Sequence, residues 1–375
     1  MKKTVRSHKK IIICLVIGAA LLMLCLFFII KVKDSLKNSG VGFPETYFIA
    51  AFDTTEYKND TNLIYYDEKF LEVYRQHISW GNACDPFYPP VLLDGKIYIA
   101  PIGAGLSYDA DEVIEIDKKT GKHKKYKTNQ HYVQGMAVSE KYIFTVNDWN
   151  YTAVIARTEK ESQKVSELEF PDELCSQIDL YEDNLYCFLL SENEGVFRTR
   201  CLIIDIETLE EVKSFDISEY GQGPHYTYMK DGILYMPIPL TKEDEPCNLL
   251  LMYNTQTEEL KEVELAQELP GQIVEYKNKL LITHVNYSHS DVLDCSVSMY
   301  NPENGEVDNY KVQSVLEQVA VKGNQLYALD VQEQAVFVYN LDSKGEELEL
   351  VEKYTLQSKQ GTSSYRYYIG GFFMK

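Results

Sequence analysis

Apolar and polar residues follow a pattern that recurs seven times between Tyr47 and the C-terminus. Each unit has a short apolar run, a tight polar turn, a second apolar run that usually carries Tyr, and a variable loop. A third apolar run ending in Asp or Asn and a charged fourth run complete it. Equivalent positions of the second run are separated by 45, 43, 49, 46 and 46 residues: Tyr98, Ile143, Tyr186, Tyr235, Leu281 and Tyr327. A period of about 40–50 residues with four strands per unit is typical of β-propellers.

The third run of most units ends in a residue that suits a hairpin turn. Asp and Asn favour such turns because their side chains can accept a hydrogen bond from the backbone two residues further on. The residues concerned are Asp67, Asp117, Asp205, Asn254, Asn301 and Asn340. The charged fourth run is expected to lie outermost, where charge discourages pairing with other chains.

The two ends of the repeat array are incomplete in complementary ways. Residues 46–52 resemble a second run that lacks a first run, and residues 367–374 resemble a first run that lacks a second. The C-terminal strand is therefore expected to complete the blade begun near the N-terminus, which removes the open sheet edges. The sequence predicts an all-β fold, a seven-bladed β-propeller over residues 46–375.

The N-terminal region predicts a membrane anchor. Residues 11–30 form an uninterrupted apolar run, long enough to span a bilayer at 1.5 Å rise per residue. Five basic residues precede this run and three follow it, so the N-terminus is expected inside and the propeller outside. We therefore predict a cytoplasmic basic tail (1–10), one transmembrane helix (11–30) and a tether (31–45).

A cleaved signal peptide is the alternative to an uncleaved anchor. Its apolar core is normally 7–15 residues and ends at small residues, whereas here the longer run is followed by Lys31, Val32 and Lys33. A lipoprotein signal would need a small residue before the acceptor cysteine, but Leu24 precedes Cys25. These features favour the anchor, and the basic, compact N-terminus is typical of a bacterial protein of the cytoplasmic membrane.

Charge changes the set of expected partners. The chain has 37 Lys and Arg against 57 Asp and Glu. Seven basic and no acidic residues lie at or before Lys33, so the remainder carries a net charge of −27. Such a surface favours solubility and repels nucleic acid and anionic lipid headgroups. We expect no nucleic-acid partner.

The repeat resembles the seven-bladed propellers of the YVTN and quinoprotein-like (WD40-like) superfamily. Residues 142–147, Tyr-Ile-Phe-Thr-Val-Asn, are the nearest match to the strand motif of that superfamily. The resemblance covers about residues 46–375 and implies the fold more than an activity. The chain has only two Trp, which excludes the repeated Trp motif of quinone-dependent dehydrogenases, and no cofactor is expected.

Aligning the units on their tight turns places an amide at one position of the first run in four blades. First strands line the channel of a propeller, and carboxamides both donate and accept hydrogen bonds, which suits a polar neutral ligand such as a sugar or peptide. Packing between blades is the alternative role for these repeated residues. The candidate ligand-binding residues are Gln134, Gln177, Gln272, Gln318, Tyr226, His131 and His225.

Two further groups of residues carry weaker signals. The cluster of His284, His289, Asp291 and Asp294 has no known metal-ligand spacing, so a polar loop is expected and no metal site is predicted. Beyond the anchor lie six cysteines: Cys84, Cys175, Cys187, Cys201, Cys247 and Cys295. Cys187 and Cys201 flank one loop, and either a disulfide or two buried thiols would fit their positions.

The sequence therefore favours a membrane-tethered, extracytoplasmic binding module that acts as a surface sensor, scaffold or accessory subunit. Its partner would be a protein or a cell-surface glycan or peptide. The alternative is a lyase or hydrolase acting on a carbohydrate or cyclic peptide at one mouth of the channel. A compact set of convergent His, Glu, Arg or Tyr would favour the enzyme, and a dispersed ring of Gln and Tyr favours binding.

Overall fold

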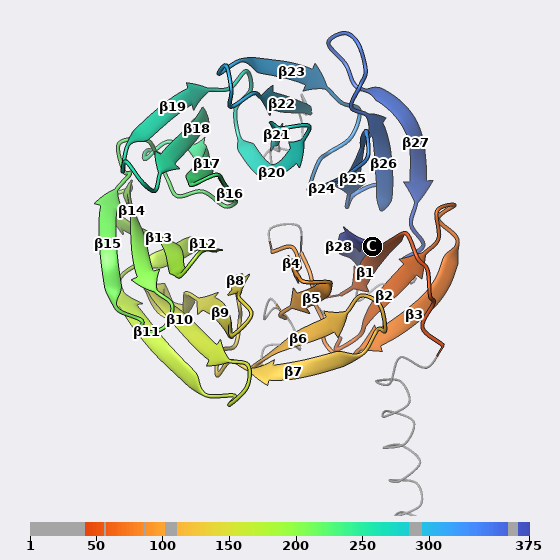
Figure 1. The fold of residues 1–375 in the computed structure, drawn as a ribbon, viewed down its shortest axis with the longest axis horizontal. Coiled ribbons are helices and arrows are strands. Elements are labelled where there is room, and N and C mark those ends of the chain that lie inside the picture. The colour runs from red at the N-terminus through yellow and green to blue at the C-terminus, as the bar shows by residue number, and fades with distance from the viewer. Residues whose placement is uncertain (1–41, 56–57, 86–87, 102–110, 285–294, 359–366) are drawn as a thin grey trace, which may run out of the picture.

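Seven four-stranded antiparallel sheets are arranged around a central axis like the blades of a propeller (Figure 1). The computed structural model describes residues 42–55, 58–85, 88–101, 111–284, 295–358 and 367–375. In each blade the first strand lies nearest the axis and the fourth lies on the rim. The prediction of an all-β, seven-bladed propeller is confirmed.

The blades are numbered in the order of their strands. Blade 1 contains β28 (Tyr368–Met374), β1 (Ile49–Thr54), β2 (Thr61–Tyr66) and β3 (Glu72–Ile78). Blade 2 contains β4 (Val91–Leu93), β5 (Lys96–Ile99), β6 (Glu112–Asp117) and β7 (His123–Lys127). Blade 3 contains β8 (Gly135–Val138), β9 (Tyr142–Asn147), β10 (Thr152–Glu159) and β11 (Val165–Pro171), with the short 3-10 helix η2 (Trp149–Tyr151) between β9 and β10.

The remaining four blades follow the same order without interruption. Blade 4 contains β12 (Leu174–Tyr181), β13 (Asn184–Asn193), β14 (Val196–Asp205) and β15 (Glu211–Asp216). Blade 5 contains β16 (Tyr228–Lys230), β17 (Ile233–Leu240), β18 (Pro246–Asn254) and β19 (Leu260–Glu264). Blade 6 contains β20 (Pro270–Tyr276), β21 (Lys279–His284), β22 (Ser296–Tyr300) and β23 (Val307–Lys311). Blade 7 contains β24 (Gln318–Lys322), β25 (Gln325–Asp330), β26 (Ala335–Asn340) and β27 (Glu349–Thr355).

Blade 1 is assembled from both ends of the described chain. Strand β28 pairs antiparallel with β1, from Ile49 opposite Met374 to Thr54 opposite Tyr368. The innermost strand of this blade is thus supplied about 300 residues after its neighbours. This pairing completes blade 1, which packs against blade 7. It is the closure of the ring expected from the incomplete ends of the repeat array.

The hydrophobic core is divided into seven clusters, and each cluster lies between two neighbouring blades. Alternate residues of one strand belong to different clusters because successive side chains point to opposite faces of a sheet. Ile49 and Ala51 pack against blade 7, while Ala50 and Phe52 pack against blade 2. Both faces of each sheet are therefore buried, which explains the nearly continuous apolar runs in the sequence.

The hairpins between third and fourth strands are built as the sequence predicted. The carboxylate of Asp117 accepts the backbone N–H of Lys119 at 2.9 Å, and the side chain of Asn254 accepts that of Gln256 at 2.8 Å. The other four turns repeat this bond, with acceptors Asp67, Asp205, Asn301 and Asn340. One local rule thus shapes the same turn in six blades.

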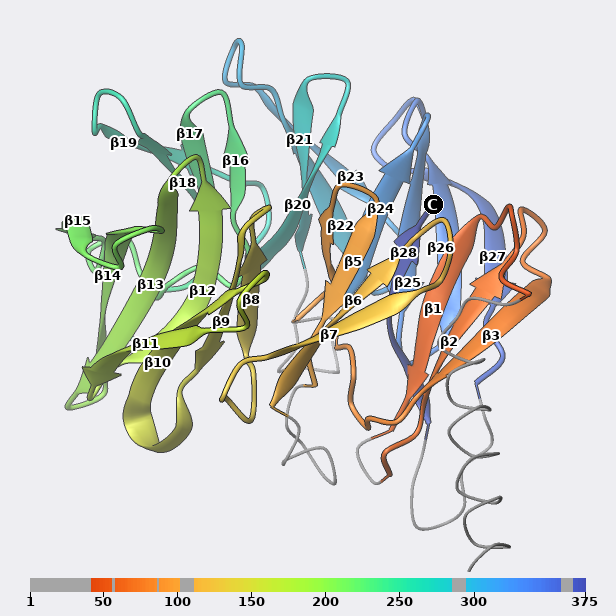
Figure 2. The same ribbon diagram turned by 60° about the horizontal axis from the view of Figure 1, so that its bottom comes forward.

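The connections of the ring lie on two opposite faces (Figure 2). The tight turns between first and second strands and between third and fourth strands form one face, which we call the hairpin face. The segments that lead into the first strands, together with the connections between second and third strands, form the other, which we call the mouth face. In Figure 2 the hairpin face is uppermost.

The cysteines are buried or half-buried thiols. Cys201 lies opposite Phe188, and Cys187 lies opposite Leu202, so the two cysteines differ by one position in register. A shift of one residue sends side chains to opposite faces of a sheet, and Cys187 and Cys201 accordingly belong to different clusters. All six cysteines of the described residues are free thiols.

The double glycine in β28 is explained by the close approach of the segment around Cys84. A Cβ atom on Gly370 would lie 2.1 Å from the carbonyl oxygen of Cys84, and one on Gly371 would lie 2.4 Å from its Sγ atom. Neither distance is compatible with a side chain. Because residues 370 and 371 have no side chain, the segment around Cys84, which leads into blade 2, packs directly against β28.

Residues 1–41, which include the predicted anchor, lie outside the described residues. Within the part of the chain that the structure describes, no helix has the length and apolar character needed to cross a membrane.

Replacing Gly370 and Gly371 should test their close contact with Cys84. Gly371→Ala is expected to lower the free energy of unfolding by about 2–3 kcal/mol, because its methyl group overlaps the Cys84 sulfur. In a chain that already carries Cys84→Ala, the sulfur is absent, so adding Gly371→Ala should lower the free energy of unfolding much less. Gly370→Ala should not be rescued in the same way, because it meets a backbone oxygen. Denaturant unfolding of the three single variants and of the two double variants with Cys84→Ala measures these differences, and equal rescue of both glycine variants would contradict the assignment.

Candidate functional site

The predicted amides lie on or beside the innermost strands, but two of them bind the neighbouring blade. Gln318 donates to the carbonyl of Phe372 at 2.8 Å and accepts the N–H of the same residue at 2.7 Å. Gln272 accepts the N–H of Val319 at 2.7 Å. These bonds join blade 7 to blade 1 and blade 6 to blade 7, so the hydrogen-bonding groups of Gln318 are used within the ring.

The other two amides stand at the starts of blades 3 and 4. Gln134 precedes β8, and its Oε1 atom accepts the backbone N–H of Asp148 at 3.2 Å. Gln177 lies in β12 at an irregularity of the pairing with β13, and its side chain lines a cavity. The structure therefore does not bring the four amides together into one ligand-binding ring.

The aromatic candidates divide in the same way. Tyr226 is buried and His225 is exposed, and both line the cavity beside Gln177. His131 is exposed and is not among the lining residues, although its carbonyl accepts a bond from the amide of Asn147. Three of the seven predicted residues thus meet at one place.

This cavity has a volume of about 130 Å³ and lies at the mouth-face ends of the inner strands of blades 2, 3 and 4, beside the segment that leads into blade 5. Apolar groups form most of its wall, and the polar groups are an amide, an imidazole and phenol groups. Its lining residues are Ala83, Tyr88, Pro89, Pro90, Val91, Ile99, Ala100, Val133, Gly135, Met136, Gln177, His225 and Tyr226. None of these described lining residues is Lys, Arg, Asp or Glu.

The segments that lead into the strands explain how the wall is built. Pro89 and Pro90 precede β4 with fixed backbone φ angles, which gives a rigid edge. Gly135 begins β8 where a Cβ atom would lie 2.7 Å from a methyl carbon of Val146. The absence of a side chain there lets β8 approach β9 closely, and Met136 then completes the wall.

The electrostatic environment keeps the site neutral. Burial lowers the pKa of His225 below its usual value, because the surrounding protein withdraws the ring from bulk water although the residue keeps some exposed surface. Burial, followed by the nearby Asp148, Tyr132 and Asp85, raises the pKa of Tyr88. At neutral pH the imidazole therefore offers one donor and one acceptor, and the phenol stays protonated.

Two carboxyl groups that do not line the cavity also have raised pKa values. Burial raises the pKa of Asp179 to about 6, although Thr227 of blade 5 donates to its Oδ2 atom at 2.8 Å. Burial also raises the pKa of Glu317 to about 7, and Asp330 and Asp85 raise it further by repulsion. Glu317 accepts the backbone N–H of Val331 and so holds the connection that follows β25.

The cluster around His284 is structural as far as it is described. The ring of His284 is buried, with Nδ1 3.0 Å from the carbonyl of Glu268 and Nε2 2.8 Å from the hydroxyl of Ser298. Burial lowers its pKa to about 4. His289, Asp291 and Asp294 lie outside the described residues. Among the described residues, no three His, Cys, Asp or Glu side chains are grouped as a metal site would require.

The sequence did not identify several residues of the site. Tyr88 and Met136 carry no repeated signal, because the segments before β4 and within β8 differ from the other units. Outside the wall, the sequence also did not single out Asp179 and Glu317, which lie two residues and one residue from a predicted glutamine. Asp179 is bonded to Thr227 of the next blade, and Glu317 is bonded to Val331, which follows β25 of its own blade, so neither environment can be read from the neighbouring sequence.

The chain is similar to several solved propellers in fold. A functionally unknown protein from Desulfotomaculum acetoxidans has a TM-score of 0.59 and 12% identity, with 88% of this chain and 99% of that chain covered. A protein from Bacteroides uniformis, assigned provisionally as a 6-phosphogluconolactonase, has a TM-score of 0.56 and 12% identity, with 86% and 100% covered. The WD40 domain of Neurospora crassa Pan2 has a TM-score of 0.50 and 11% identity, with 79% and 91% covered. At these identities the similarity shows the fold alone.

No protein-family model matches the sequence, and no curated protein matches it.

The elevated pKa of Glu317 predicts how stability changes with pH. The folded state binds the proton of the Glu317 carboxyl group more tightly than the unfolded chain does. The contribution of this proton to the free energy of unfolding is therefore complete below about pH 4.5 and is lost as the pH rises through about 7. Between pH 4.5 and 8, the stability of Glu317→Gln relative to wild type should rise by about 2 kcal/mol. Unfolding at a series of pH values measures this difference. The exposed Glu303→Gln is the control, and equal pH profiles for wild type and Glu317→Gln would contradict the prediction.

Proposed function

We propose that this protein is a membrane-tethered, extracytoplasmic propeller that binds a small neutral ligand, or a neutral group of a larger partner, in the cavity beside His225. The observation that carries the proposal is the lining itself. An apolar wall with a few convergent hydrogen-bonding groups is typical of ligand sites in proteins. The volume of about 130 Å³ suits a single sugar ring or one side chain of a peptide.

The charge of the lining supports a neutral ligand over an anionic one. The polar groups that the described wall offers are those of Gln177, His225, Tyr226 and Tyr88. A phosphate or carboxylate placed there would lose its water without gaining a cation, which is costly in a confined site. The provisional lactonase name of one similar structure is therefore not carried over as a substrate.

The arrangement also favours binding over catalysis. General acid–base catalysis needs a group within about 2.6–3.2 Å of the reacting atom and a pKa near the working pH. The groups with a pKa near neutrality, on Asp179 and Glu317, are not among the residues that line the cavity. The imidazole of His225 lines it, but its lowered pKa makes it a poor acid at neutral pH.

The tether is part of the same proposal. The apolar run of residues 11–30 and its basic flanks support an anchor that holds the ring outside the cytoplasmic membrane. A surface sensor, scaffold or accessory subunit would use such a position. Resistance of the full chain to alkaline carbonate extraction tests the anchor independently of any ligand.

A thermal-shift screen of the full chain in detergent should identify the ligand class. The probes are neutral monosaccharides and oligosaccharides, cell-wall fragments and short peptides. A ligand at 100 times its Kd stabilises the fold by about 2.7 kcal/mol, which is a shift of several degrees. Gln177→Leu and His225→Leu should reduce the affinity at least about tenfold, because each leaves a ligand group without its partner.

The control variant is His131→Ala, which changes an exposed histidine outside the cavity and should leave the shift unchanged. A shift that survives both cavity variants would contradict the assignment of the site. Turnover of a confirmed ligand would favour the lyase or hydrolase instead.

A further inference from the structure

The rim of blade 2 carries a concentration of positive charge that no other blade shows. Between Asp117 and Thr128 the sequence has six lysines and one histidine. They lie on the β6–β7 hairpin and on β7, the outermost strand of the blade. We call these residues the lysine tract: Lys118, Lys119, Lys122, Lys124, Lys125 and Lys127. All of them except Lys118 are exposed.

The lysine tract is largely without acidic partners. Lys125 pairs with Glu112 at 2.6 Å, whereas Lys124 donates to the carbonyl oxygen of Lys160. Within the described part of the chain, Lys119, Lys122 and Lys127 have no carboxylate at ion-pair distance. Charged outer strands discourage pairing with other chains, but this role does not require that all the charges be positive. The outer strands β15 and β19, for example, carry both acidic and basic residues.

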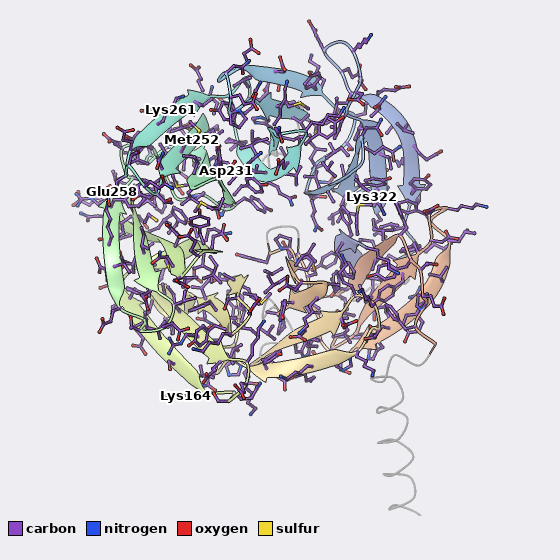
Figure 3. The ribbon with its side chains drawn as sticks, viewed as in Figure 1. Lys164, Asp231, Met252, Glu258, Lys261 and Lys322 are labelled. Atoms are coloured by element: carbon purple, nitrogen blue, oxygen red, sulfur yellow. The ribbon has the colours of Figure 1, made fainter. Side chains whose placement is uncertain are left out.

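More lysines gather on the hairpin face beside the tract. Lys118 donates to the carbonyl of Met374 at 2.6 Å, close to the C-terminal residue Lys375. Burial lowers the pKa of Lys118, and repulsion from Lys322 and Lys375 lowers it further. Figure 3 labels Lys322 on blade 7, where its side chain is exposed. Blades 7, 1 and 2 therefore present neighbouring cations on the hairpin face.

The described chain begins against the same hairpin. A Cβ atom on Gly121, in the β6–β7 turn, would lie 2.3 Å from the ring of Phe43, and that ring also packs edge-on against Tyr65 and Tyr74. Eleven residues separate residue 30, the end of the predicted anchor, from Gly42. An extended chain of that length reaches at most about 40 Å. With residues 11–30 in a membrane, a tether of this length would keep the hairpin within about 40 Å of the membrane surface.

We propose that the lysine tract docks on the anionic lipid headgroups of the membrane in which residues 11–30 are anchored. The proposal rests on the anchor of the proposed function. A surface with a net charge of −27 is repelled by an anionic bilayer, so the basic hairpin is the part of the ring that the bilayer attracts. Docking through the hairpin face turns the mouth face, with the cavity, away from the membrane and toward ligands.

The test is residue-resolved labelling of the full chain in nanodiscs. A membrane-impermeant amine reagent is applied in discs of neutral phosphatidylcholine and in discs that contain anionic phosphatidylglycerol, and mass spectrometry measures the modification of each lysine. In the anionic discs, labelling of Lys119 and Lys122 should slow at least about fivefold, since each lysine gains appreciable attraction near such a surface. In 1 M salt, where the screening length is about 3 Å, the protection should disappear.

Three exposed lysines in other blades serve as internal controls, and their labelling should be equal in both discs. They are Lys58 of blade 1, Lys242 of blade 5 and Lys311 of blade 6, and all three lie at the mouth face. The variant Lys119→Gln/Lys122→Gln/Lys124→Gln should also lose the lipid-dependent protection of Lys127, whereas Lys58→Gln/Lys242→Gln/Lys311→Gln should keep it. Both variants remove the same charge from exposed positions.

The outcomes separate the two proposals. Protein that is not retained in any disc would show that the anchor of the proposed function fails. Protein that is retained but labelled equally at Lys119 and Lys122 in both lipids would overturn the docking. Protection by soluble polyglutamate or polyphosphate, without protection by anionic lipid, would also overturn it and would identify a polyanion as the occupant.

Discussion

Each sheet of this protein is apolar on both faces, and burial of those faces against two neighbours is the interaction on which the whole structure depends. A four-stranded sheet alone would leave one or both faces in water. The seven apolar clusters each lie between two blades, so every blade is completed by the next. In an open array of blades, the last blade would expose one apolar face to water. Closure of the ring buries that face against the first blade. Strand β28 makes that return possible because it joins the chain ends within one sheet.

Closure also determines which polar groups are available for function. Gln318 uses both ends of its amide on the backbone of β28, and Gln272 bonds to the first strand of the next blade. Gln177 lies instead where the chain of blade 4 departs from regular pairing, and there its side chain reaches a cavity. The same residue type at the same repeat position therefore serves packing in some blades and lines a cavity in another. The rigid ring then holds the loops of the mouth face in place, which suits recognition.

The sequence predicted the features that depend on local chemistry and on periodicity. The repeat length gave seven blades, and the Asp and Asn residues predicted hairpin turns whose bonds are present in six of them. It could not predict features that depend on register or on a neighbouring blade. Cys187 and Cys201 flank one loop, yet a difference of one position places them on opposite faces of the sheet. The repeat also could not show which glutamines face a backbone group, nor that Gly370 and Gly371 meet Cys84.

The most direct test of the central claim is native-state hydrogen exchange on a chain that ends at residue 367 and so lacks β28. If burial between blades depends on closure of the ring, removal of this strand should lower amide protection in distant strands such as β13 of blade 4 and β21 of blade 6. The loss there should approach that in β1, because the blades unfold as one unit. Unchanged protection in blades 3–6, with loss confined to blades 1, 2 and 7, would contradict the account. It would show that neighbouring blades are stable without a closed ring.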